Sequence, residues 1–220
     1  MNTAQRMLAG VVLGLCAMGA QAAENADLSV GGLIRPAACN VSLSNNGVVD
    51  QGIVKALDLK NSEFTRLDDA TLTMNIDCEA SMAVAVGLTD ARSGSSVSGI
   101  PHFITSAYYD GNGFGLGKSG NNKLGSYVIV PKHTATADGK TVTTIWKGAS
   151  TGWKAYSSND AMGPAWMHSW SGTSGTSPVN HQNISQELVI KTALNKKADL
   201  PNIDSDLPID GLATFTLRYL

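Results

Sequence analysis

The 220-residue chain has few charged residues, few aromatic residues and only three cysteines. Charged residues make up 15% of it and the formal net charge is −2, so it lacks the basic surface expected of a nucleic-acid-binding protein. No apolar run is long enough to span a bilayer, and no segment shows helical periodicity over three turns. These absences argue against a nucleic-acid partner and a membrane span, and they favour an all-β protein.

Catalytic signatures are also missing, since the chain has no G-x-S-x-G elbow, no H-E-x-x-H pair and no phosphate-binding glycine loop. The four histidines are His102, His133, His168 and His181. They share no metal-ligand spacing, and we predict that they are ordinary surface or loop residues. Asp110-Gly111-Asn112 begins like a calcium loop, but Asn121 stands where an acidic ligand is needed. We therefore expect no enzyme activity, no cofactor and no metal site.

The first 22 residues have the features of a signal peptide that is removed on export. Arg6 precedes an apolar core at Met7–Met18, and Ala20-Gln21-Ala22 fits a cleavage site. Cys16 lies in this segment after Leu15, and not after the small residue that a lipoprotein site requires. We therefore expect an exported protein without a lipid anchor, with residues 23–220 forming a single domain.

Two cysteines, Cys39 and Cys78, remain once the signal peptide is removed. In an exported protein such a pair most often forms one disulfide. The bridge would close a loop of about 40 residues, which the chain-entropy model makes worth roughly 4 kcal/mol.

Alternating and short apolar runs predict about seven strands. The expected strands are Leu28–Val30, Leu33–Leu43, Thr71–Cys78, Met82–Leu88, Tyr127–Val130, Thr141–Trp146, Gln186–Leu194 and a terminal strand. Asp138-Gly139 predicts a hairpin that joins the fifth and sixth of these strands. Short strands with polar turns predict an antiparallel β-sandwich, in which the Gly- and Trp-rich residues 93–182 form an elaborated middle segment.

The C-terminal residues alternate between apolar and polar up to the last position. The residues predicted to face inward are Ile209, Gly211, Ala213, Phe215, Leu217 and Tyr219. This pattern predicts a strand with one buried face. Terminal strands often lie at a sheet edge or close a sandwich, and edge strands are where other chains pair.

Three features coincide with those of a known family. They are the signal peptide, the stretch Gly32-Leu33-Ile34-Arg35-Pro36-Ala37-Ala38-Cys39 with its partner Cys78, and the strand Gly211–Leu220 with a penultimate tyrosine. Together they resemble chaperone–usher fimbrial (pilin) subunits, and most closely the fimbrial-like family labelled DUF1120. The stretches Phe114-Gly115-Leu116-Gly117 and Leu124-Gly125-Ser126-Tyr127 are similar to the DUF1120 pattern.

The resemblance implies an immunoglobulin-like, pilin-like sandwich that lacks its last strand. A periplasmic chaperone would fill the resulting groove first, and the N-terminal extension of a neighbouring fimbrial subunit would fill it at the usher, both by β-augmentation. The implied groove edge consists of Ile209, Gly211, Ala213, Phe215, Leu217, Tyr219 and Leu220, whose terminal carboxylate would anchor the chaperone. The implied location is the periplasm and then a cell-surface fimbrium or the medium.

A donor arm of a dozen residues or more is expected of a polymerising pilin. Only Ala23–Asp27 precede the first expected strand at Leu28, so we expect a structural or adhesive subunit at a fibre tip, or one that does not polymerise. Alternatively, the terminal strand closes a sandwich that contains all its own strands and has no open groove.

The tryptophans suggest an alternative function. All four lie in the middle segment, at Trp146, Trp153, Trp166 and Trp170. On glycine-rich loops they would stack on sugar rings, with Asn159, Asp160 and His168 bonding hydroxyls, or they would fill a secondary core. A self-complete exported carbohydrate-binding module, with a host or surface glycan as partner, is therefore the alternative.

Overall fold

The structure is a computed structural model that describes residues 26–34 and 37–220. The predicted signal peptide lies outside the described residues. The chain divides into two units at Arg35 and Pro36, so the segment 26–34 and the folded unit are described separately. Among the residues described, no helix is both long and apolar enough to cross a membrane.

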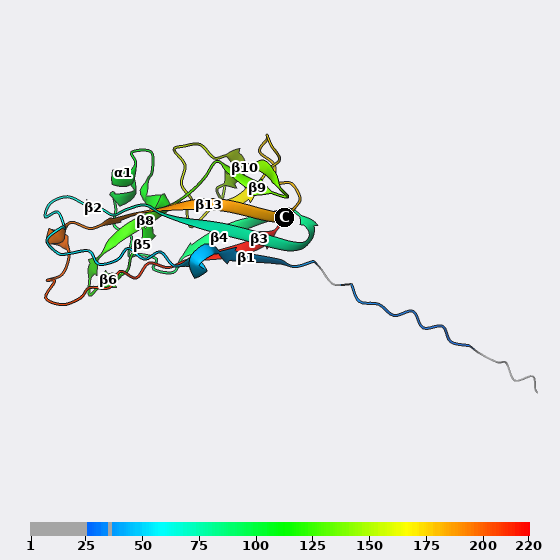
Figure 1. Cartoon of the computed structure of the whole chain (residues 1–220), viewed down its shortest axis with the longest axis horizontal. Helices are drawn as coiled ribbons and strands as arrows, with labels where there is room; N and C mark the ends of the chain where they lie inside the picture. The colour runs from blue at the N-terminus through cyan, green and yellow to red at the C-terminus, as the bar shows by residue number, and fades with distance from the viewer. Residues whose placement is uncertain (1–25, 35–36) are drawn as a thin grey trace, which may run out of the picture. The chain divides into compact units, whose positions relative to one another are not determined.

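Almost all regular structure in the folded unit is β-strand (Figure 1). In chain order the elements are β1 (Cys39–Leu43), η1 (Ser44–Gly47), β2 (Thr65–Arg66), β3 (Ala70–Met82), β4 (Val84–Asp90), α1 (Ile100–Ile104), η2 (Asp110–Asn112), β5 (Phe114–Gly115), β6 (Lys118–Ser119), β7 (Asn122–Lys123), β8 (Gly125–Pro131), β9 (Thr134–Ala137), β10 (Lys140–Lys147), β11 (Lys154–Ala155), β12 (Met167–Trp170), β13 (His181–Leu194), η3 (Lys197–Asp199) and β14 (Ala213–Tyr219).

One antiparallel path of strands makes up the sandwich, in the order β1-β3-β13-β9-β10-β12-β4-β14, and β8 pairs with β13. The first layer contains β1, β3, β13, β8 and β9, and the second contains β12, β4 and β14. β10 passes between the layers, since its first half pairs with β9 and its second half with β12. The predicted all-β, immunoglobulin-like fold is therefore confirmed.

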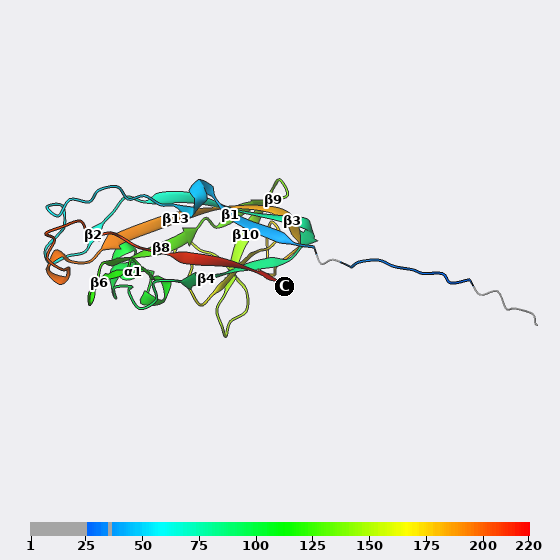
Figure 2. The ribbon, with the colours of Figure 1, turned by 90° about the horizontal axis from the view of Figure 1, so that it is seen from below.

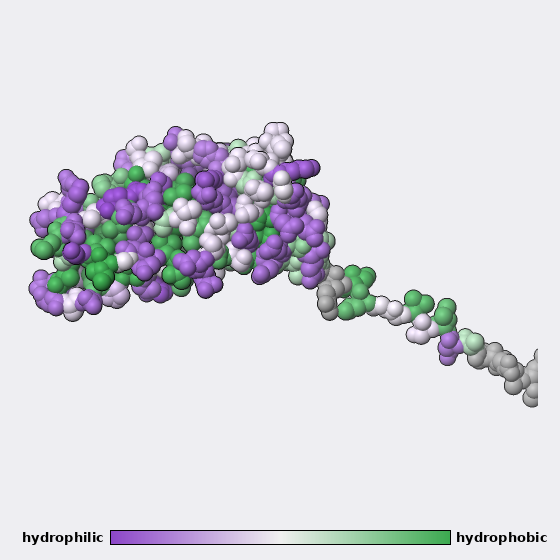
Figure 3. Space-filling view, viewed as in Figure 1, coloured by the Kyte–Doolittle hydropathy of each residue, from purple (hydrophilic) through white to green (hydrophobic). Residues whose placement is uncertain are grey.

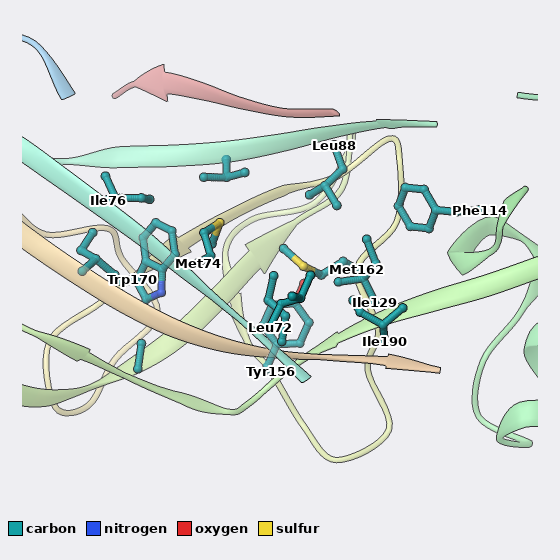
Figure 4. Packing of buried hydrophobic residues seen from close by; sticks show 14 of the residues in the cluster. Leu72, Met74, Ile76, Leu88, Phe114, Ile129, Tyr156, Met162, Trp170 and Ile190 are labelled. Carbon is teal, nitrogen blue, oxygen red and sulfur yellow. The ribbon is translucent and has the colours of Figure 1, made fainter. Parts of the chain in front are cut away.

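The hydrophobic core fills the space between the two layers (Figure 4). β3 contributes Leu72, Met74 and Ile76, which alternate with exposed or half-buried polar residues as predicted. Leu188 of β13 and Phe114 of the middle segment are fully enclosed. The middle segment thus adds to the same core, and it also forms a small second cluster of Tyr108, Val128 and Ala161.

The Asp138-Gly139 turn exists, but it joins β9 to β10 and not β8 to β10. Both turn residues have positive φ, as a two-residue hairpin turn of this kind requires. β8 pairs with β13 over seven residues instead. The sequence prediction of the hairpin partner was wrong because the short strand β9, with its small Thr and Ala residues, carries little hydrophobic signal.

The expected strands before Cys39 are not found in the described residues. Residues 26–34 have no strand or helix, and β1 begins only at Cys39. The prediction that the first strand starts at Leu28 was therefore wrong. The first strand is preceded by more than the five residues that were predicted to precede it. The apolar alternation around Leu28 is real, but Leu28 and Val30 are each 89% exposed.

Candidate functional site: an open seam between the first and last strands

The two ends of the strand path, β1 and β14, lie side by side without pairing to each other as strands in the described part of the chain. Figure 2 shows β14 in red, with β4 along one side and β1 along the other. We call the space between Cys39–Leu43 and Ala213–Tyr219 the open seam.

Side chains of β14 alternate across the seam as the sequence predicted. Ala213, Phe215 and Leu217 are half-buried and pack against the core, whereas Thr214 and Thr216 are exposed. No residue of β14 is fully buried, in contrast to the inward residues of β3. The inner face of β14 is therefore only partly covered.

The residues of β14 whose side chains face inward also direct their backbone N–H and C=O groups into the seam. The Leu220 amide donates to Ala83 and the Ala91 amide donates to Leu212, so the even-numbered residues of β14 face β4. Because such pairs alternate in an antiparallel ladder, the N–H and C=O groups of Ala213, Phe215, Leu217 and Tyr219 face away from β4. These unpaired groups can accept a further strand.

β1 has the same backbone arrangement on the opposite side of the open seam. Glu79 donates its backbone N–H to Ala38, so residue 38 faces β3, and Cys39, Val41 and Leu43 face away from it. Their side chains are half-buried against the core. Both edges of the open seam thus offer backbone donors and acceptors above a partly uncovered apolar floor.

A cavity of about 480 Å³ lies within the seam, lined by Val41, Ser42, Leu43, Asn46 and Ala213–Phe215. A larger cavity of about 860 Å³ lies beyond the start of β14, between residues 49–59 and 200–209. Both bounding segments lack strands and helices apart from turns. Long irregular segments of this kind are uncommon in compact domains and are often functional.

Apolar side chains line the larger cavity and stand at its rim. Val54, Leu59, Leu200 and Leu207 are half-buried against the core, while Ile53 is 95% exposed. Apolar side chains gather at this end of the folded unit in the space-filling view (Figure 3). An open, largely aliphatic hollow continues the seam, which suits side chains donated by another segment.

Polar contacts hold both ends of β14 in place. Before the strand, Arg92 bonds Asp210 through its backbone oxygen at 3.1 Å and its carboxylate at 2.7 Å, which lowers the pKa of Asp210. At the other end, the hydroxyl of Tyr219 accepts the backbone N–H of Cys39 at 3.0 Å. Cys39 is in turn linked to Cys78 by the predicted disulfide.

The implied groove-edge residues occupy different parts of this arrangement. Ala213, Phe215 and Leu217 lie in β14, and Ile209 and Gly211 lie in the exposed segment before it. Tyr219 and Leu220, at the end of the chain, are more than half exposed. β1 and residues 49–59 form the opposite wall, which was not predicted from the sequence, although Cys39, Val41 and Leu43 alternate with Asn40 and Ser42.

Segment 26–34 has no strand or helix and carries four aliphatic side chains that are 81–97% exposed, at Leu28, Val30, Leu33 and Ile34. Leu28, Val30 and Ile34 share one face of an extended chain with Gly32. Exposed apolar residues with strand alternation are the kind of surface on which protein segments associate, so this segment is a candidate interaction site.

Two of the four tryptophans, Trp170 and Trp146, belong to the hydrophobic core or pack against it. Trp170 is buried and donates to Gln186 at 3.1 Å, so it cannot present a face to a sugar, and this part of the alternative was wrong. Trp146 stacks on Trp166 with ring centroids 4.3 Å apart. Trp153 lies under the ammonium group of Lys147, 4.9 Å from the ring centroid.

Two histidines predicted to lie on the surface are buried. His168 is fully enclosed between β10 and β4 and bonds the buried hydroxyl of Tyr156. Burial lowers its pKa to about 3, so its ring is neutral. His181 contacts Asp138 at 3.6 Å. Their burial could not be predicted from the sequence, because a histidine in a buried strand has no distinctive spacing.

Within residues 26–34 and 37–220, no group of three or more His, Cys, Asp or Glu side chains lies close enough to hold a metal ion. Unsatisfied side-chain donors at Trp146 and His168 lie inside the packed sandwich and not in the seam.

Comparison with known proteins supports the DUF1120 resemblance. Residues 28–128 match the model of the family described as "Protein of unknown function (DUF1120)". The chain is 31% identical over 142 residues to "Uncharacterized protein YhcF" of Escherichia coli K12, a match that covers 59% of each chain. It is 27% identical over 241 aligned positions to "Protein GltF" of the same organism, covering 94% of each.

Proposed function

We propose that the protein is an exported, fimbrial-type structural or adhesive subunit that is assembled by β-strand complementation in the open seam. The observation that carries this proposal is the pair of unpaired edges, β1 and β14, above a partly uncovered core. A strand placed in the seam would supply backbone hydrogen bonds for affinity and alternate side chains for specificity. The match to DUF1120 and the disulfide, which is typical of exported proteins, fit this role.

Segment 26–34 is the proposed donor strand for a neighbouring subunit. Nine residues of extended chain span roughly 30 Å, which is enough to match the seven residues of β14. Since β1 begins at Cys39, the residues preceding it are available as an arm. A tip position or a non-polymerising role was expected only because the predicted donor arm was too short. With this longer arm, that reason no longer applies.

Charge favours one direction for the donated strand. Asp204, Asp206 and Asp210 precede β14, and Arg218 lies near its end. The donor segment begins with Asp27 and is followed in the sequence by Arg35. An antiparallel arrangement brings opposite charges together at both ends, whereas a parallel one brings like charges together.

A labelled peptide of residues 26–37 tests the donor role against the purified mature chain. We expect saturable binding, measured by fluorescence anisotropy, and new strand pairing at β14, measured by amide exchange. Val30→Asp in the peptide should abolish binding because it places a charge on the apolar face. Ser29→Asp, on the opposite face, is the matched control and should bind like the parent peptide.

Substitutions in the seam give the reciprocal test. Leu217→Asp should remove peptide binding, and Thr216→Asp, one residue away on the exposed face, should leave it intact. If the parent peptide fails to bind the wild-type chain, or binds both variants alike, the proposed complementation is wrong.

Export and chaperone dependence are tested in cells. We propose that a periplasmic pilus chaperone occupies the seam before assembly, with the usher as the site of exchange. The chain should accumulate in the periplasm only when such a chaperone is co-expressed, and the two should co-purify. Stable monomer without any chaperone would contradict this step.

A further inference from the structure

One contact crosses the open seam between its two edges. Tyr219 extends from the last residue of β14, and its hydroxyl accepts the backbone N–H of Cys39, the first residue of β1, at 3.0 Å. The disulfide to Cys78 holds Cys39 against β3. Next to Tyr219, the Leu220 amide is fixed to the carbonyl of Ala83 at 3.1 Å. The contact therefore joins two anchored points.

The N–H group that Tyr219 engages belongs to the edge that a further strand would pair with. Cys39 faces away from β3, as do Val41 and Leu43. A complementing strand that forms a full ladder with β1 needs this N–H as a donor. It can obtain it only if the Tyr219 hydroxyl leaves.

The two edges are also held close together. Some Cα atoms of β1 and β14 lie within 8 Å of one another. A strand paired with both neighbours needs two strand spacings, about 9.5 Å in all. Full occupation of the seam therefore requires the edges to separate, and the Tyr219 contact opposes that separation.

We propose that Tyr219 is a latch that closes one end of the open seam in the uncomplemented subunit and must be released for a donated strand to pair along its whole length. This inference rests on the proposed function, because it concerns regulation of the same seam. The latch competes with the N-terminal part of the incoming strand, which would pair last. The end of the seam beside Ala213 and the larger cavity stays open for the first contact.

Tyr219→Phe tests the latch because it removes only the hydroxyl and keeps the ring. In the mature chain alone, the Cys39 amide should exchange with solvent slowly in the wild type and at least several-fold faster in the variant, measured by NMR. The peptide of residues 26–37 should bind the variant about fivefold more tightly, as expected for loss of one competing hydrogen bond.

A shorter peptide of residues 30–37 is the matched control. In the antiparallel arrangement it lacks the part that reaches Tyr219, so it should bind both chains equally. Equal affinity of the longer peptide for both chains, equal gains for both peptides, or unchanged exchange at Cys39 would each overturn the latch. Failure of the longer peptide to bind either chain would instead overturn the complementation on which the latch depends.

Discussion

The centre of the sandwich and its open seam are built from the same kind of strand but differ in how fully the strands are partnered. β13 pairs with β3 along most of its length and with β8 on its other side, and its Leu188 has no exposed surface. β14 pairs with β4 alone in the described residues, and its Leu217 is only half-buried.

This difference shows that alternation of apolar residues does not by itself indicate a closed core. β3, β13 and β14 all alternate, yet only the first two have both edges paired. A strand with an apolar face and one unpaired edge retains binding capacity in its backbone and in its side chains. The centre supplies stability, and the seam is where we propose that a further strand binds.

The largest expected effect comes from the bond that joins the two regions. The Cys39–Cys78 disulfide fixes edge strand β1 to central strand β3. Cys39→Ser should lower the free energy of unfolding by about 4 kcal/mol, because the unfolded chain regains the freedom of a closed loop. Urea unfolding of the oxidised wild type and the variant measures the loss. Reduced wild type should resemble the variant, and an unchanged midpoint would contradict the prediction.

A substitution in the centre should have the next largest effect. Leu188→Ala removes a fully enclosed side chain between β3 and β8, and we expect a loss of about 3 kcal/mol in the free energy of unfolding from transfer and cavity formation. Val189→Ala, on the other face of β13, is the matched control. Its cost should be clearly smaller, and equal costs would show that the inward register of β13 is incorrect.

The sequence predicted the centre better than the seam for a physical reason. The period-two pattern of Leu72, Met74 and Ile76 follows directly from a strand with one buried face, and so does that of Phe215 and Leu217. Alternation near Leu28 looks the same, but whether a strand finds a partner depends on the rest of the fold. The pattern therefore located the terminal strand correctly and placed the start of β1 wrongly.

Residues whose roles depend on long-range pairing could not be found from the sequence. To predict the opposite wall of the seam, one would have to know that β14 comes to lie beside β1. His168 required knowing that β12 lies between β10 and β4. Neither pairing leaves a local signal, because the residues that meet are far apart along the chain.

Acid should weaken the sandwich through His168, which lies away from the seam. Burial lowers its pKa to about 3, while in the unfolded chain the pKa is about 6.5. Between these values the unfolded state binds the extra proton, so stability falls as pH falls below 6.5. Between pH 7 and pH 5 the expected loss is about 2 kcal/mol.

Urea unfolding at pH 7 and pH 5 measures this loss. Carboxylates with a lowered pKa, such as Asp69 and Asp138, take up protons only at lower pH, so they do not contribute to it. His168→Gln should remove most of the pH dependence, whatever its stability at pH 7. His102→Gln, at an exposed position, should keep it. A pH dependence unchanged in His168→Gln would show that the buried ring is not its source.

The smallest effect is expected in the seam itself. Leu217→Ala can be compared directly with Leu188→Ala, because both substitutions replace a leucine by alanine. Leu217→Ala should cost about 1 kcal/mol in the uncomplemented chain, since the half-buried side chain loses less contact and leaves no closed cavity. Saturation with the peptide of residues 26–37 should raise that cost towards the Leu188→Ala value, because the added strand covers Leu217. Thr216→Ala should cost little in either state. If Leu217→Ala already costs as much as Leu188→Ala without peptide, the seam is energetically a closed core, and the difference between the two regions disappears.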